Sequence, residues 1–213
     1  MNVLKCKKNI KDSPCVVGKY IIQGSGVAIK NTDGGTLVLS AAHVCDLTPP
    51  EVLVKTAEKW NVSLTALNLY GVSKPAKTVS ATFAKNDLTD LCLLFSKDLQ
   101  TTAVGLARRN PEVGDQVISI NSPMGIFHPP TVPILSGIYS GPVNQVNDMV
   151  TIPSIGGSSG GAVFNQEMKL VGIVFASVRK FPHITLVSSL TTTRKFLRMA
   201  LSEFRQNKKK FTQ

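Results

Sequence analysis

A segment rich in glycine and serine carries the most chemical information in this chain. It reads Gly157-Ser158-Ser159-Gly160-Gly161. Gly/Ser segments of this kind are more often plain loops or hairpin turns, but a serine among such small neighbours can also be exposed on a tight turn. Attack by a serine hydroxyl on an acyl group leaves an oxyanion, which two N–H groups two residues apart can stabilise. The N–H groups of Gly157 and Ser159 have this spacing, so the segment is a candidate nucleophile with an oxyanion hole.

A base and an acid stand at the ends of two apolar runs. His43 closes the run 39–43, and Asp90 directly precedes the apolar run 91–94. A serine hydroxyl is a weak nucleophile until a base takes its proton, and a histidine base needs a carboxylate to fix its tautomer and stabilise the imidazolium. The order His43, Asp90, serine therefore predicts a nucleophilic triad.

Other residues compete for these roles. Asp87 lies three residues before Asp90, but Asp90 is preferred because the strand that follows it would bury it beside the histidine. His128 and His183 are the other histidines, and His128 lies in a proline-rich loop without a preceding strand. His43 is therefore the predicted base.

The three segments together resemble the chymotrypsin-like (trypsin-fold) serine proteases. Those enzymes use the same chain order and have an Ala-Ala-His segment and a Gly-x-Ser-Gly-Gly segment, here residues 41–43 and 157–161. Because the family nucleophile is followed by two glycines, the resemblance selects Ser159 over Ser158. Residues 24–29, 113–125, 135–141 and 171–174 are similar to the HtrA-type and viral branch. The resemblance covers roughly residues 20–190.

The chain also departs from the digestive enzymes of that family. Ser158 stands where they have an aspartate, so the ion pair with a newly cut N-terminus cannot form, and no activation cleavage is expected. Val44 separates His43 from Cys45, whereas the digestive enzymes place a disulfide-bonded cysteine directly after the histidine. No residues are left for the peptide-binding domain of HtrA-type enzymes. We therefore expect a bare protease domain.

Short runs of Val, Ile, Leu and Thr separated by Gly, Pro, Asn and Asp predict an all-β fold. The resemblance implies two antiparallel β-barrels of chymotrypsin-like type, over residues 1–97 with His43 and Asp90, and over 98–190 with Ser159. Residues 191–213 are predicted as a basic helix and tail, with Leu197, Leu201 and Phe204 on one helical face. Strands are expected at 15–22, 25–30, 36–40, 51–55, 62–70, 77–84, 91–95, 104–107, 116–120, 132–140, 147–152, 162–164, 169–177 and 183–188.

The four cysteines lack the spacing of a metal site. Cys45 and Cys92 are expected as buried free thiols beside the catalytic residues. Cys6 and Cys15 could form a disulfide across a short loop, but nothing in the sequence requires an oxidising compartment, so their redox state stays open. No metal or cofactor is expected.

The net charge of +11 is concentrated at the two ends of the chain. Four lysines precede residue 12, and seven basic residues against one acid follow Leu190. A basic groove across the barrels is therefore not expected. The basic ends are either solubilising tails or weak contacts to nucleic acid or an anionic membrane. With no signal peptide or apolar run of membrane-spanning length, we expect an intracellular protein, such as one in the cytoplasm of an infected cell.

By the resemblance, the pocket for the substrate side chain before the scissile bond is walled by two segments that carry no charge. They are Pro153, Ser154 and Ile155, and Phe175, Ala176 and Ser177. This favours a small-to-medium apolar or polar side chain over Lys or Arg. His183 could reach the pocket and favour Glu or Gln, or it could be a surface histidine.

The sequence predicts a serine endopeptidase with polypeptide substrates that acts through an acyl-enzyme, and polyprotein processing, as in viruses, suits its features. Two alternatives stay open. One is a binding module on the same fold that is silent or activated by a partner. The other is a protein that binds nucleic acid or membrane through its basic ends.

Overall fold

A computed structural model of the chain describes residues 1–7, 15–82, 88–178 and 180–212. The chain divides into two compact units, which are described separately. The first consists of residues 1–22 and 46–64, and the second of residues 23–45 and 65–213. The second unit contains His43, Asp90 and the segment around Ser159, so it is the unit that matters for chemistry.

The smaller unit is built on a three-stranded antiparallel sheet in the order β2-β1-β5. The strands are β1 (Asn2–Cys6), β2 (Gly18–Lys19) and β5 (Ala57–Asn61). Val3 and Ala57 are buried on it, and a disulfide joins Cys6 to Cys15. This unit takes up part of the sequence that was expected to form the first barrel.

The strand expected at 51–55 is instead a helix, α2 (Glu51–Thr56). Pro50 directly precedes the helix, and Glu51 lies in its first turn, where an acidic side chain favours the helix dipole. Glu51 and Lys55 also form an ion pair one turn apart, with 2.5 Å between Oε1 and Nζ. These helix-start signals outweigh the β-propensity of the valines.

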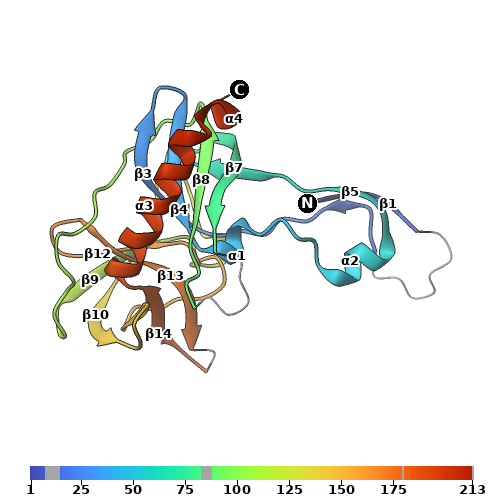
Figure 1. Cartoon of the computed structure of the whole chain (residues 1–213). Helices are drawn as coiled ribbons and strands as arrows, with labels where there is room; N and C mark the ends of the chain where they lie inside the picture. The colour runs from blue at the N-terminus through green and yellow to red at the C-terminus, as the bar shows by residue number, and fades with distance from the viewer. Residues whose placement is uncertain (8–14, 83–87, 179, 213) are drawn as a thin grey trace. The chain divides into compact units, whose positions relative to one another are not determined.

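The first half of the larger unit is a five-stranded sheet in the order β3-β4-β8-β7-β6 (Figure 1). Its strands are β3 (Val27–Thr32), β4 (Gly35–Ser40), β6 (Leu64–Leu67), β7 (Ser73–Ala81) and β8 (Cys92–Lys97). Every residue of β4 is buried, as its apolar sequence and central place predict. Among the described residues these strands pair as a sheet, so the predicted first barrel is not fully confirmed. The short helix α1 (Ala42–Cys45) follows β4 and carries His43.

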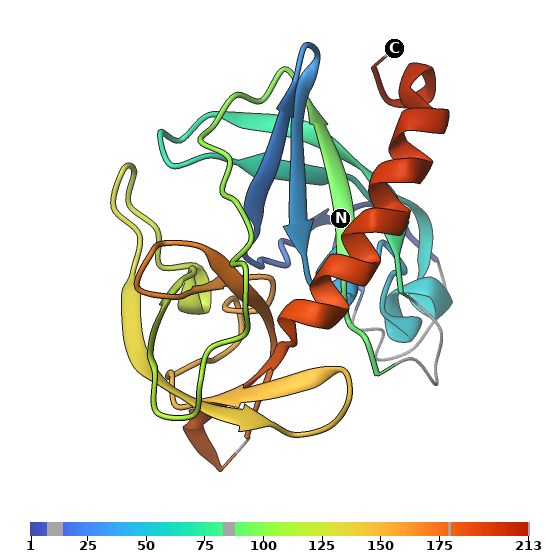
Figure 2. The ribbon, with the colours of Figure 1, turned by 60° about the vertical axis from the view of Figure 1, so that its left-hand side comes forward.

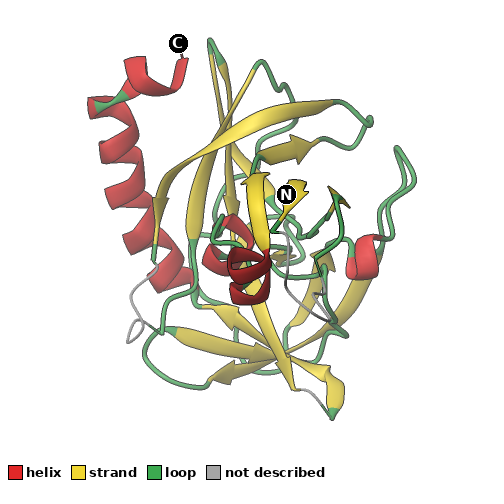
Figure 3. Ribbon diagram, turned by 90° about the vertical axis from the view of Figure 1, so that its right-hand side faces the viewer, coloured by secondary structure: helices red, strands yellow, loops and turns green. Residues whose placement is uncertain are grey.

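The second half forms a closed six-stranded barrel in the order β10-β11-β14-β13-β12-β9, as expected. Figure 3 shows the strands of the chain in yellow. Its strands are β9 (Gln116–Ile120), β10 (Ile134–Pro142), β11 (Asn147–Val150), β12 (Ala162–Phe164), β13 (Leu170–Val178) and β14 (Phe181–Ser188), and the 3₁₀ turn η1 (Pro123–Gly125) follows β9. The glycine and serine segment lies in the loop from β11 to β12. Residues 104–107, predicted as a strand, form an isolated bridge between Leu106 and Leu170 instead.

The predicted C-terminal helix is present as α3 (Leu190–Gln206), followed by α4 (Lys208–Thr212). Ser189 caps α3 by accepting a hydrogen bond from the Thr192 N–H. Leu197 and Phe204 are buried and Leu201 is partly buried, in a core shared with strands of both the sheet and the barrel. The Phe95 and Phe204 rings lie 5.2 Å apart. Figure 2 shows α3 running alongside strands of this unit. None of the described helices is both long and apolar enough to span a membrane.

Cys45 and Cys92 form a disulfide, which corrects the expectation of free thiols. The reason lies in the register of the sheet, because β4 pairs with β8 so that Ser40 lies opposite Cys92. The helix α1, directly after β4, then brings Cys45 within 6.5 Å of Cys92 between Cα atoms. The sequence could not show this contact, because 47 residues separate the two cysteines.

Removal of the Cys45–Cys92 disulfide by a double Cys→Ala substitution is expected to lower the free energy of unfolding by about 4 kcal/mol, from the loop that the bond closes. Removal of Cys6–Cys15, which closes a shorter loop in the other unit, is the control, with an expected loss of about 2.5 kcal/mol. Denaturant unfolding measured on both variants checks this order. An equal or reversed order would contradict the placement of the Cys45–Cys92 bond.

Candidate active site

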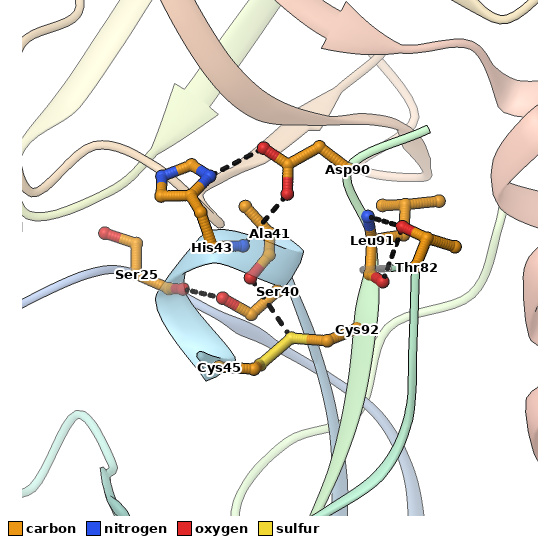
Figure 4. The surroundings of a disulfide bond; sticks show 9 residues. All are labelled: Ser25, Ser40, Ala41, His43, Cys45, Thr82, Asp90, Leu91 and Cys92. Carbon is orange, nitrogen blue, oxygen red and sulfur yellow. Dashed lines mark hydrogen bonds and ion pairs between the residues drawn. A yellow bond between two sulfur atoms is a disulfide. The ribbon is translucent and has the colours of Figure 1, made fainter. Parts of the chain in front are cut away.

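His43 and Asp90 form a close pair (Figure 4). His43 Nδ1 lies 2.6 Å from Asp90 Oδ2, and the His43 backbone N–H donates to Asp90 Oδ1 at 3.0 Å. An ionised carboxylate can only accept hydrogen bonds, so the proton of the neutral imidazole lies on Nδ1. Nε2 then carries a free lone pair. About half of the His43 side chain and a quarter of the Asp90 side chain are exposed, which leaves the imidazole accessible to a substrate.

The pair changes the acidity of both groups. The hydrogen bond with Asp90 raises the pKa of His43 above its ordinary value, against the opposing effect of burial, and the charge of Asp90 adds to the rise. Burial raises the pKa of Asp90, but hydrogen bonds from the His43 ring and from the His43 and Ala42 backbone outweigh it, and the net pKa is lowered. Asp90 therefore stays ionised, and its carboxylate can stabilise a protonated His43 ring, which a histidine base in acyl transfer needs.

The competing residues have other surroundings. Asp87 lies outside the described residues. His128 is exposed in a turn where its backbone pairs with Thr131, and His183 is exposed with its ring 5.4 Å from that of Phe181. Neither histidine has a carboxylate partner within the described residues. His43 is thus the histidine that the fold equips with an acid.

The segment 157–161 is a tight turn, as the sequence predicts. The Ser158 N–H donates to the Ile155 carbonyl at 2.9 Å, and the Gly161 N–H donates to the Ser158 carbonyl at 2.9 Å. Ser158 is buried at 1% exposure, and its Oγ accepts from the Ile155 N–H. Ser159 is partly exposed. Of the two serines, Ser159 is the one that a substrate can reach.

Two backbone N–H groups of the turn are available for an anion. Within the described part of the chain, neither the Gly157 N–H nor the Ser159 N–H donates to a protein acceptor. Gly157 has a φ of +94°, and a Cβ there would lie 2.5 Å from the Ser122 carbonyl oxygen. Only glycine fits this backbone shape. The turn can therefore present two donors without a side chain in the way.

Ser25 connects this turn to the sheet that carries His43, and the sequence analysis assigned it no role. Its N–H donates to the Ser159 carbonyl at 2.7 Å, and its Oγ donates to the Gly157 carbonyl at 2.8 Å. Its own carbonyl accepts from Ser40 Oγ at 2.7 Å. The flanking Gly24 and Gly26 were a signal of close backbone approach. A Cβ on Gly24 would lie 2.5 Å from Val44 Cγ1 and 3.2 Å from the Ser159 carbonyl oxygen.

These contacts bring the His43 segment and the Ser159 segment against the same residue pair, Gly24 and Ser25. Within the described residues, no hydrogen bond joins Ser159 to His43 directly. Such bonds are often long in substrate-free enzymes and shorten when substrate binds. These contacts therefore fix the backbone arrangement of His43, Asp90 and Ser159, and what the described residues lack is a hydrogen bond between the Ser159 hydroxyl and the His43 ring.

A cavity of about 200 Å³ lies beside the serine. It is lined by Ser154, Ile155, Gly156, Ser158, Ser159, Val174, Phe175, Ala176 and Ser177. Five of the seven residues predicted for the substrate pocket are among them, whereas Pro153 and His183 are not. The lining has no ionisable side chain. No group of three or more metal-ligating side chains occurs among the described residues.

A comparison with known proteins assigns the chain to a family. A family model described as a trypsin-like peptidase domain matches residues 24–173. The chain belongs to the trypsin-like peptidase family. The match begins beside Ser25 and includes His43, Asp90 and Ser159. No curated protein matches the chain in a comparison of sequences.

Solved structures of proteases share the fold. A serine endoprotease from Yersinia pestis is 22% identical with a TM-score of 0.63, and the match covers 84% of this chain and 57% of that one. An HtrA-type protease solved with a decapeptide is 20% identical with a TM-score of 0.62, and the match covers 84% of this chain and 51% of that one. This trypsin-like peptidase chain thus spans little more than half the length of these structures.

The titration of His43 tests the pair without any substrate. With the pKa of His43 raised in the folded protein, the pair stabilises the fold below about pH 6.5 as long as Asp90 is ionised. This contribution is lost as pH rises through the folded pKa of His43, and also as pH falls through the lowered pKa of Asp90. Asp90→Asn removes the charged acceptor, so the pKa of His43 is expected to fall. Asp115→Asn, at a carboxylate that accepts from the Glu112 N–H, is the control. NMR titration of the histidine ring signals measures the pKa of His43 in both variants. An unchanged His43 pKa in Asp90→Asn would disprove the interaction between His43 and Asp90.

Proposed function

We propose that this chain is a serine endopeptidase that hydrolyses peptide bonds through an acyl-enzyme. The observation that carries the proposal is the His43–Asp90 pair with a free Nε2, held through Ser25 near a turn that offers two unused N–H donors. Ser159 is the nucleophile, His43 the general base, and Asp90 orients His43. Membership in the trypsin-like peptidase family supports these roles.

The reaction follows from this geometry. Ser159 Oγ attacks the carbonyl carbon of the substrate while its proton passes to His43 Nε2. The oxyanion accepts hydrogen bonds from the Gly157 and Ser159 N–H groups. Cleavage of the C–N bond then forms the acyl-enzyme, and His43 gives its proton to the leaving amine. Water attacks the ester with His43 again as base, which releases the acid and restores Ser159.

The cavity beside Ser159 is the proposed pocket for the substrate side chain before the scissile bond. A cationic side chain buried there would lack a counter-charge, because the lining has no acid. Small-to-medium apolar or neutral polar side chains fit its size. Ser158 in place of an aspartate is consistent with an enzyme that needs no ion pair with a cut N-terminus, and processing of a polyprotein is the proposed setting.

A second function is favoured by one observation, the lack of a hydrogen bond between Ser159 and His43 within the described residues. It is a binding module of the same fold whose activity depends on a partner. In that case the resting chain would bind peptide without cleaving it.

Labelling with a fluorophosphonate, which reacts with activated serines, separates the two functions. We expect the wild-type chain to be labelled at Ser159, Ser159→Ala and His43→Ala to stay unlabelled, and Ser158→Ala to serve as a control that is labelled. Asp90→Asn is expected to lower the rate of labelling by up to ~10⁴-fold, because the same change in the triad of a serine protease lowers kcat by about that factor. A folded wild-type chain that resists labelling would support the partner-dependent binding module.

Peptides that differ only in the residue before the scissile bond test the pocket. We expect kcat/KM at least about tenfold higher for Ala, Val or Thr than for Lys or Arg, a difference of about 1.4 kcal/mol in the barrier. Cleavage rates measured for the series by mass spectrometry decide the matter. Preference for Lys or Arg would show that the described cavity is not the pocket.

A further inference from the structure

Thr82 stands where the pairing of β7 with β8 ends. The last residue pair of the two strands joins Ala81 to Cys92. One residue further, the Thr82 N–H donates to the Leu91 carbonyl at 3.0 Å. Asp90 precedes Leu91 and lies just before β8 begins, so the regular ladder between the strands does not reach it. Some other contact must hold the backbone of Asp90 in place.

The Thr82 hydroxyl supplies that contact, and Figure 4 shows the part of it that involves Leu91. Its Oγ accepts a hydrogen bond from the Leu91 N–H at 3.0 Å and donates to the Thr89 carbonyl oxygen. It also lies 3.2 Å from the Leu91 carbonyl oxygen. One hydroxyl therefore contacts both peptide groups that flank Asp90.

The geometry of the chain makes this bridge specific for Asp90. The φ angle of Asp90 fixes the orientation of the peptide group that contains the Thr89 carbonyl. The ψ angle of Asp90 fixes the orientation of the peptide group that contains the Leu91 N–H. When both peptides are attached to one oxygen, the two rotations are restricted together. The direction of the Cα–Cβ bond of Asp90 is then restricted as well.

That direction matters because the carboxylate meets two groups at once. Oδ2 lies 2.6 Å from His43 Nδ1, and Oδ1 accepts from the His43 backbone N–H at 3.0 Å. A rotation of the Asp90 backbone would lengthen at least one of these hydrogen bonds. We propose that Thr82 is a positioning residue that holds Asp90 in register with His43 through the two peptide groups on either side of Asp90.

The variants isolate the hydroxyl from the shape of the side chain. Thr82→Val keeps the shape and removes the hydroxyl, whereas Thr82→Ser keeps the hydroxyl and removes the methyl group. Thr78→Val is the matched control, because Thr78 lies on the same strand, pairs with Leu94 of β8 and makes no side-chain hydrogen bond within the described residues.

The first readout is the pKa of His43, measured by NMR titration of the folded full chain. We expect Thr82→Val to lower it toward the value in Asp90→Asn, and Thr82→Ser and Thr78→Val to keep the wild-type value. A purely structural threonine would lower the unfolding midpoint of Thr82→Val and leave the His43 titration unchanged, which would overturn the proposal. A changed titration in Thr82→Ser would overturn it too.

Thr82→Val leaves the buried Leu91 N–H without its acceptor, so this variant could fail to fold. The wild-type chain then provides the test through hydrogen exchange. Protection of the Leu91 amide comparable to that of amides within β8 is expected. Exchange of this amide at the rate of an exposed loop amide would show that the Thr82 bridge does not persist in solution, and the proposal would fall.

The kinetic consequence rests on the proposed function. In a working peptidase, Thr82→Val is expected to lower kcat by at least about tenfold with KM unchanged, and Thr82→Ser to restore it. If wild-type Ser159 is not labelled by a fluorophosphonate, the proposed function fails while the His43 titration still decides the role of Thr82. If labelling succeeds and the titration does not change, only the role of Thr82 fails.

Discussion

The pairing of β4 with β8 is the constraint on which the site depends. Ser40 at the end of β4 lies opposite Cys92 at the start of β8. His43 follows the first strand by three residues, and Asp90 precedes the second by two. The register of this one strand pair therefore brings the two residues together. A shift of one residue would turn every side chain of β8 to the other face of the sheet and separate His43 from Asp90.

Three further contacts secure the same junction. The Cys45–Cys92 disulfide ties α1 to β8, the Thr82 hydroxyl bridges the peptides beside Asp90, and two groups of His43 bind the Asp90 carboxylate. The disulfide links two elements, the Thr82 hydroxyl contacts the backbone on either side of Asp90, and His43 binds the Asp90 side chain. An exposed ion pair alone contributes little to stability. A partly exposed His–Asp pair therefore needs such support from its surroundings to keep a fixed geometry.

The turn of residues 157–161, which carries the proposed nucleophile Ser159, is positioned by hydrogen bonds from Ser25 to the carbonyl groups of the turn. Ser25 binds the carbonyls of Gly157 and Ser159, and within the described part of the chain the N–H groups of these two residues have no acceptor. Because the carbonyls are already bound, the peptide groups have less freedom to rotate. Donors that are oriented before the reaction do not have to reorganise as charge develops on the substrate. The same residue accepts from Ser40, so one contact network reaches from the turn to the strand that leads to His43.

The residue types in the chain were enough to predict the candidate triad and the tight turn, because a base, an acid and a glycine-rich serine segment are local patterns. The C-terminal helix was predictable for the same reason, since its apolar face repeats within seventeen residues. The separate N-terminal unit was not, because its strands come from two distant segments. The helix at 51–56 was also missed, because Pro50 and Glu51 favour the start of a helix whereas the two valines that follow favour a strand.

The amino-acid sequence by itself determined which side chains can do chemistry and the family that they resemble. Only the tertiary structure decided how they are held. The Cys45–Cys92 bond joins residues 47 positions apart, and Ser25 reaches Gly157 from a distant segment of the chain. Neither contact is visible as a local pattern in the sequence. The disulfide arises from the register of β4 with β8, and the Ser25 contact arises where the sheet meets the barrel. Thr82 is only eight residues from Asp90, yet its role depends on the point at which the β7–β8 ladder ends.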